Sequence, residues 1–287
     1  MLKSHRLCTL ALLSTALMLA GCDSGKPAAP LAPSAERLEP PKPKSVAAIA
    51  YAVTKGGSSI EFSMEAPIEQ ITGRVRDAVT GEVKVDLTDL SKTTALITAD
   101  IGSLVLTQRK KANTGDAAYG DETKQDKQNE HARGWLEIDD KNPDHETHRR
   151  VQLTVTSVKA DATDVTKLTG DERKVKATVS GEFLLHGRKT AKTVDVEVTF
   201  TFKDGQATAL RVRSVKPFAV GLEEHDVRPR DALGKLANTL LSELSDKVAK
   251  EAQVSLDFTA QVLAPSSAPT SSAPTSSAPT SSAPNPK

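Results

Sequence analysis

Cysteines, aromatic residues and net charge are all scarce in this chain of 287 residues. It has two cysteines, and Cys8 lies in the apolar N-terminal run, so Cys22 alone remains if that run is removed as a leader. A single thiol excludes an intramolecular disulfide, and we expect no thiol-based catalysis. The formal net charge of +1 argues against a nucleic-acid partner, which requires a basic surface. Aromatic residues make up only 3%, so apolar interior positions must be mostly aliphatic or small.

Sequence motifs of common catalytic sites are missing as well. There is no Gly-x-Ser-x-Gly and no phosphate-binding glycine loop. His131 and His225 have no paired nucleophile that the sequence reveals, and His186 is expected to hydrogen-bond the backbone of a turn. The His/Asp-rich stretch 139–148 contains proline and several charges, which are typical of a solvated loop rather than of a metal site. We therefore expect no catalytic residue, no metal ion and no cofactor; an enzyme that uses His186 or His131 is the weaker hypothesis.

The N-terminus has the features of an export signal. Lys3 and Arg6 precede an uncharged apolar run, residues 7–19, that is too short to cross a bilayer. The run ends in Leu-Ala-Gly-Cys, which resembles the lipobox of bacterial lipoproteins. We predict a signal peptide over residues 1–21 and lipidation of Cys22, which would anchor the chain to the bacterial cell envelope, facing the periplasm.

Two segments have compositions that cannot form a core of their own. Residues 22–45 are rich in proline and are predicted to be an extended tether. Residues 264–287 repeat Ala-Pro-Thr-Ser-Ser and are predicted to be a disordered tail. The folded domain is therefore expected over residues 46–263.

Within that domain, apolar residues alternate with polar ones in a series of short runs, as in half-buried β-strands. The clearest pair lies within 175–202 and is interrupted only by the basic break 186–190, which predicts an antiparallel hairpin. Residues 231–248 instead have apolar residues every three or four positions, which predicts an amphipathic helix before the last strand. Eight to ten antiparallel strands suit a closed barrel or a β-sandwich.

The hairpin also carries a resemblance. Residues 181–190, Gly-Glu-Phe-Leu-Leu-His-Gly-Arg-Lys-Thr, followed by Val194, resemble the G-x-L-x-L-H-G-x-T-K-x-V segment of the YceI-like family. Tyr51, the Ser-Ile-Glu-Phe run at 59–62 and Gly73 occur in the order of that family's opening segments, although Ala66 stands where a histidine is common. The resemblance implies an all-β, lipocalin-like closed antiparallel barrel of about eight strands that holds a polyisoprenoid or similar amphiphile.

The side chains that should face the barrel interior form the predicted ligand site. Trp135 follows a long polar stretch, 109–134, which is expected to be an insertion that caps the barrel or a solvated loop. With it, the predicted ligand-binding residues are Ile60, Phe62, Met64, Val83, Val85, Trp135, Phe183, Leu185, Val194, Val196, Val198 and Phe200.

The function expected from these observations is that of a lipid-anchored envelope protein that binds a polyisoprenoid, a quinone or a fatty-acid-like amphiphile. Its partners would be that lipid and the membrane, and the resemblance also allows a homodimer. Small barrels can instead fill their interior with side chains. The alternative is therefore a structural or interaction lipoprotein with a filled barrel and no ligand.

Overall fold

The computed structural model describes residues 30–66, 68–113, 115–228 and 249–263. The predicted signal peptide, the lipidation site Cys22, the amphipathic helix 231–248 and the C-terminal tail lie outside these residues. Within them, no helix has the length and apolar character needed to span a membrane.

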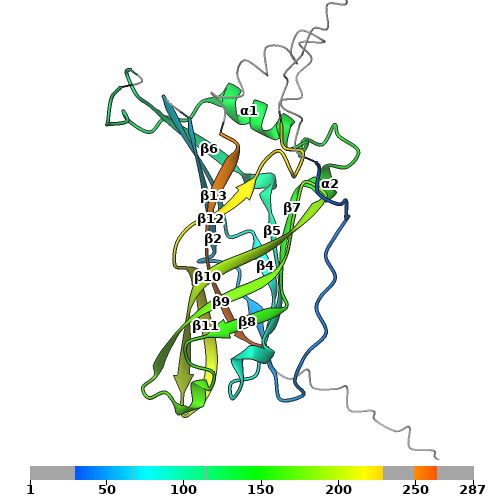
Figure 1. Cartoon of the computed structure of the whole chain (residues 1–287), viewed down its shortest axis with the longest axis vertical. Coiled ribbons are helices and arrows are strands. Elements are labelled where there is room, and N and C mark those ends of the chain that lie inside the picture. Colours follow the sequence, from blue (N-terminus) through cyan, green and yellow to red (C-terminus); the bar gives the residue numbers. More distant parts are fainter. Residues whose placement is uncertain (1–29, 67, 114, 229–248, 264–287) are drawn as a thin grey trace, which may run out of the picture.

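The described residues form thirteen strands in one sheet and two short α-helices (Figure 1). The strands are β1 Ile49–Val53, β2 Ser59–Ala66, β3 Glu69–Arg76, β4 Val79–Val85, β5 Thr94–Asp100, β6 Val105–Lys110, β7 Arg150–Val155, β8 Ser157–Ala160, β9 Glu172–Leu185, β10 Arg188–Lys203, β11 Gln206–Ser214, β12 Phe218–Gly221 and β13 Glu251–Val262. The helices are α1 Asp126–Trp135 and α2 His145–His148, and three 3₁₀ turns are η1 Leu90–Lys92, η2 Ile101–Ser103 and η3 Val165–Lys167.

Eight of the strands close into an antiparallel barrel in the order β1-β4-β5-β7-β9-β10-β11-β13. Closure comes from β1, which pairs with β4 on one side and with the last three residues of β13 on the other. The predicted fold class, a closed barrel of about eight strands, is therefore confirmed, and the β-sandwich alternative is wrong.

The length of β13 extends the sheet beyond the closed barrel. Its C-terminal part pairs with β1 and β11, whereas its N-terminal part pairs with β2 and β12. From β2 the sheet continues through β3 to β6. Figure 1 shows this extension reaching the end of the barrel where α1 and α2 lie.

The predicted hairpin is formed by β9 and β10, with a tighter turn than the sequence suggested. Leu185 pairs directly with Arg188, so only His186 and Gly187 connect the two strands. Both have positive φ, 50° and 66°, which is the geometry of a type I′ turn and matches the twist of the flanking strands.

The polar stretch 109–134 contains the helix α1, which ends at Trp135. Ala132 and Leu136 pack against a cluster formed by Val75, Ile101, Leu104, Leu106 and Ile138. The expectation that this stretch ends in a short segment covering the barrel is confirmed for α1, and a purely solvated loop is excluded.

The described part of the Pro-rich tether lies along the barrel instead of standing free. Leu38 is buried, and its N–H donates to Oε1 of Gln152 at 2.7 Å. The N–H of Ala35 donates to the carbonyl of Gly187 at 2.8 Å. The segment is thus extended, but residues 32–38 dock on the barrel, because a segment that cannot form its own core can still pack on a neighbouring one.

Candidate functional site

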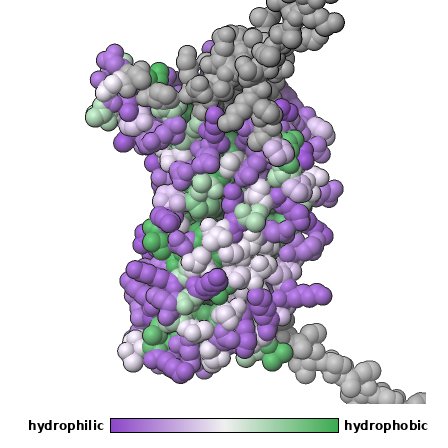
Figure 2. All heavy atoms as spheres, viewed as in Figure 1, coloured by the Kyte–Doolittle hydropathy of each residue, from purple (hydrophilic) through white to green (hydrophobic). Residues whose placement is uncertain are grey.

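The barrel encloses a cavity of about 360 Å³. This volume lies within the roughly 300–1,000 Å³ typical of small-molecule sites. The face of the barrel seen in Figure 2 carries mostly hydrophilic side chains, with apolar ones near its middle. A filled interior, the alternative that the sequence left open, does not agree with a hollow of this size.

All the residues predicted to face the ligand lie on the cavity wall. They reach it from β2, β4, β9 and β10, and Trp135 reaches it from the end of α1. On a strand every second side chain points to the same face, so the residues on these strands that face the interior could be predicted from alternation alone. That they bind a ligand remains a prediction.

A glycine positions one of these aromatic side chains. Phe62 on β2 pairs with Gly73 on β3, and its ring packs directly over this glycine. A Cβ on Gly73 would lie only 2.2 Å from the nearest ring atoms. A larger residue at Gly73 would push this ring away from its position at the cavity wall.

The sequence missed the parts of the wall that depend on tertiary contacts. Leu136 follows α1 and packs with Phe183, Leu185 and Val220. Residues of β3, β6 and β12 also line the cavity, including Ile71, Val75, Leu106, Phe218 and Val220. Alternation within β3 and β12 could have revealed some of them, but nothing local indicates that α1 would close over this end.

Polar groups on the wall are few and mostly have partners. The side-chain Oε1 of Gln152 accepts a hydrogen bond from the N–H of Leu38, and its Nε2 donates to Thr98 Oγ1 at 3.1 Å. Glu69 accepts a hydrogen bond from Gln128 Nε2 at 3.1 Å, and Asp257 forms ion pairs with Arg211 and Arg213. The wall is therefore suited to an uncharged, apolar molecule.

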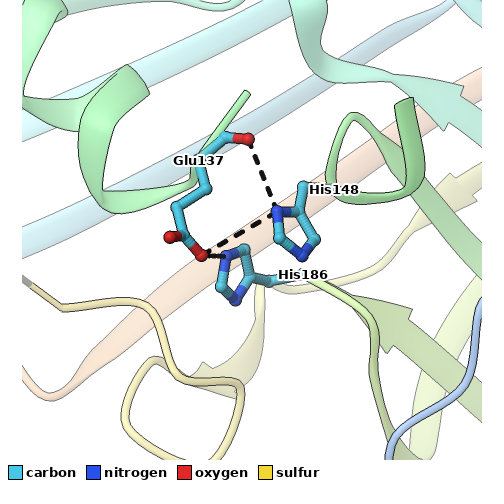
Figure 3. Close-up of side chains that lie close together, drawn as sticks. All are labelled: Glu137, His148 and His186. Atoms are coloured by element: carbon cyan, nitrogen blue, oxygen red, sulfur yellow. Dashed lines mark hydrogen bonds and ion pairs between the residues drawn. The ribbon is translucent and has the colours of Figure 1, made fainter. Parts of the chain in front are cut away.

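A second constellation lies beside the end of the cavity that α1 covers. Glu137, His148 and His186 converge there from the loop after α1, the end of α2 and the β9–β10 turn (Figure 3). Glu137 Oε2 lies 2.9 Å from His186 Nε2 and 3.9 Å from His148 Nδ1. The two imidazole rings are 4.0 Å apart between centroids.

Buried backbone contacts fix the orientation of His186. Its Nδ1 lies 3.1 Å from the carbonyl oxygen of His225, so the ring bonds a separate loop and not, as predicted, its own turn. His225 is itself fully buried, and desolvation lowers its pKa, which favours the neutral ring. Its Nδ1 lies 3.0 Å from the carbonyl of Arg188, which joins the loop to the start of β10.

The sequence did not predict this grouping. The pair considered there was His145 with His148, but His148 instead faces Glu137 and His186. His186 lies 38 positions after His148 in the chain, and no spacing rule connects it to His148 and Glu137.

Comparisons with known proteins give structural likeness only. A scan against protein-family models and a search of curated proteins gave no match. Among solved structures, the chain is similar to a polyisoprenoid-binding domain from Saccharophagus degradans implicated in plant cell wall breakdown, with 17% identity and a TM-score of 0.43, over 75% of this chain and 99% of the other. It is also similar to BcnA from Burkholderia cenocepacia, with 16% identity and a TM-score of 0.41, over 72% of this chain and 98% of the other.

Proposed function

We propose that this protein is a lipid-anchored component of the bacterial envelope that binds an amphiphile by its apolar tail inside the barrel, without catalysis. The observation that carries the proposal is the cavity of about 360 Å³ with a predominantly apolar wall. A polyisoprenoid, a quinone side chain or a fatty acid has the required chemistry, and the motif at 181–190 favours the first.

The hydrophobic effect supplies the driving force. Removing about 400 Å² of an apolar tail from water contributes roughly 10 kcal/mol at about 25 cal/mol per Å². Ordering the tail and losing its free translation offset part of this gain. The surplus is enough for stable binding of a long tail.

Charge on the wall limits what part of the ligand can enter. Among the described residues, no lysine or arginine lines the cavity, and the two carboxylates on its wall, Glu69 and Asp257, already have partners. An anionic head group inside would therefore lack a counter-charge, and burial of an unpaired charge is costly. We infer that the tail enters and that a charged head group stays outside.

The chain path relates the proposed anchor to one end of the barrel. The N–H of Ala32 donates to the carbonyl of Glu224, and Ser34 pairs with Arg188, beside the turn of the β9–β10 hairpin. Ala32 lies ten positions after Cys22, and an extended chain spans at most about 3.6 Å per residue, so this length of chain can reach about 36 Å at most. A lipidated Cys22 would hold the end carrying α1 and α2 toward the membrane, where an amphiphile could be exchanged.

A tryptophan scan of one strand tests the proposal. Val198 lines the cavity, whereas Thr201 on the same strand is exposed. The full chain and its Val198→Trp and Thr201→Trp variants would be purified from a bacterial membrane, and their organic extracts compared by mass spectrometry. We expect an amphiphile in the wild type and in Thr201→Trp, and at least a tenfold loss in Val198→Trp. Equal amounts in all three, or none in any, would contradict the proposal.

Stability measurements on the same variants provide the control for folding. A tryptophan that enters a hollow should change the free energy of unfolding little, whereas overpacking of a filled core costs about 1–3 kcal/mol. Urea unfolding of Val198→Trp therefore distinguishes a blocked cavity from a damaged fold.

A further inference from the structure

Two imidazoles and a carboxylate meet at the rim of the barrel, outside the apolar cavity. The side chain of His186 is 3% exposed, that of His148 13% and that of Glu137 26%. Their ligand atoms all lie within 4.8 Å of one another (Figure 3). None of the three lines the cavity, so the apolar ligand does not account for this grouping.

We propose that Glu137, His148 and His186 bind a divalent transition-metal ion, with Zn²⁺ as the best match. Tetrahedral bonds of about 2.0–2.2 Å place neighbouring ligand atoms about 3.3–3.5 Å apart. The distances of 2.9 Å and 3.9 Å from Glu137 Oε2 to the two ring nitrogens lie on either side of that value. Small side-chain rotations would equalise them and would move His148 Nδ1 away from the carbonyl oxygen of Glu137, which lies 3.4 Å from it without the metal.

The hydrogen bonds of His186 indicate a cation at this position. The carbonyl of His225 only accepts, so the Nδ1 of His186, 3.1 Å away, must donate its hydrogen. In the neutral ring this leaves a lone pair on Nε2, which lies 2.9 Å from the Glu137 carboxylate. A proton or a metal ion must therefore lie between these two atoms. Histidine ligands of metals typically donate their other ring N–H to a carbonyl in this way.

The backbone holds two of the three ligands in an uncommon conformation. Glu137 and His186 have φ values of 52° and 50°, in the left-handed region. The other non-glycine residues with positive φ in the described chain are aspartates, which adopt this region more readily than glutamate. This conformation directs both side chains to the same point, at a local cost of about 1–2 kcal/mol each.

The donor set selects the class of metal. Two imidazole nitrogens and one carboxylate oxygen favour Zn²⁺, Ni²⁺ or Cu²⁺, whereas Mg²⁺ and Ca²⁺ prefer oxygen ligands alone. Three protein ligands leave a fourth position for water or another small ligand.

A bound ion would fix the end wall of the cavity. It would connect the loop after α1, the end of α2 and the β9–β10 turn. Leu136 and Leu185, the sequence neighbours of Glu137 and His186, line the cavity at this end. Metal binding would therefore stabilise the cap on the barrel, whatever ligand the cavity holds.

The test uses the full chain in mild detergent, without a histidine tag and after removal of metals with a chelator. Isothermal titration with Zn²⁺ should give one site per chain, and Zn²⁺ should raise the thermal unfolding temperature. Co²⁺ should give visible d–d absorption with the intensity of a four-coordinate site. Changes in groups that support metal ligands typically cost about 10–100-fold in affinity, so Glu137→Gln and His186→Asn, which remove ligands, should cost at least as much.

Two controls make the result decisive. His131→Gln removes a histidine on α1 outside the cluster and should leave the Zn²⁺ affinity unchanged. Asparagine tolerates the left-handed turn, and circular dichroism of His186→Asn would verify that the barrel still folds. Absence of stoichiometric Zn²⁺ binding would show that a proton joins His186 to Glu137 and would overturn the proposal. Equal binding by all the variants would also overturn it.

Discussion

His186 Nε2 lies 2.9 Å from Glu137 Oε2, although the two residues are 49 positions apart in the chain. The contact joins the two-residue turn between β9 and β10 to the loop that follows α1. Both residues are adjacent in sequence to leucines that line the cavity, Leu136 and Leu185, so this polar contact lies next to the end of the apolar wall. The group formed by Glu137, His148 and His186 thus differs from the cavity in chemistry but adjoins it along the chain.

The close approach of β7 to β9 should make Gly181 intolerant of any side chain. A Cβ there would lie 1.9 Å from the carbonyl oxygen of Thr154, which is backbone and cannot move aside easily. We expect Gly181→Ala to lower the free energy of unfolding by about 3 kcal/mol, at the upper end of overpacking costs. Gly134 in α1 has open space around it, so Gly134→Ala should instead stabilise by roughly 0.5–1 kcal/mol. Urea unfolding of both variants measures the contrast, and a neutral Gly181→Ala would contradict this packing.

The docking of the Pro-rich segment on the barrel predicts unequal roles for its two leucines. Leu38 is 4% exposed, whereas Leu31 is 47% exposed. Leu38→Ala should lower the free energy of unfolding by about 2 kcal/mol, the lower end of the range for buried leucines. Leu31→Ala should lower it by less than about 0.5 kcal/mol. Denaturant unfolding compares them; equal small effects would mean that the segment is a free spacer after all.

Asp86 should make folding sensitive to acid. Its carboxylate accepts hydrogen bonds from the Ser45 and Thr88 hydroxyls and from the N–H groups of Thr88 and Asp89, and these bonds lower its pKa from 3.8 to about 2. The unfolded chain binds the proton more readily, so this stabilisation is complete well above pH 3.8 and is lost as the pH falls toward 2.

Substitution isolates that contribution. Asp86→Asn should lower the free energy of unfolding by about 1–3 kcal/mol near neutral pH. The free energy of unfolding of this variant should also fall less steeply as the pH is lowered toward 2. Ser45→Ala removes the largest cause of the pKa shift and should reduce this steepness in part. Unfolding free energies measured at a series of pH values check both, and an unchanged slope in Asp86→Asn would rule out this origin.

Tyr51 presents the opposite case, a buried polar atom that stabilises nothing. Its side chain is fully buried on β1, and its hydroxyl has no hydrogen-bond partner among the residues that the structure describes. Burial raises its pKa to about 12, so the ring stays neutral. Tyr51→Phe removes an unsatisfied group and should be neutral or stabilise by up to about 1 kcal/mol. A clear loss of stability would show that the hydroxyl has a partner.

The strands could be predicted from the sequence because alternation is a local signal, whereas the closed barrel was implied only by the resemblance to the YceI-like family. Alternation in β9 and β10 assigned Phe183, Val196 and Phe200 to the interior, and one glycine located the turn. The same local reasoning failed where contacts are distant. Proline-rich composition argues against an independent core but cannot show that Leu38 docks on Gln152. Likewise, the contact between Glu137 and His186 depends on where α1 packs on the barrel, and no local sequence pattern indicates that position.

The most direct test of the central claim is native mass spectrometry of the full chain released from its membrane in mild detergent. We expect a population heavier than the lipidated polypeptide by the mass of one amphiphile, which dissociates on activation. A spectrum with only the lipidated chain, obtained under conditions that preserve other protein–lipid complexes, would contradict that claim.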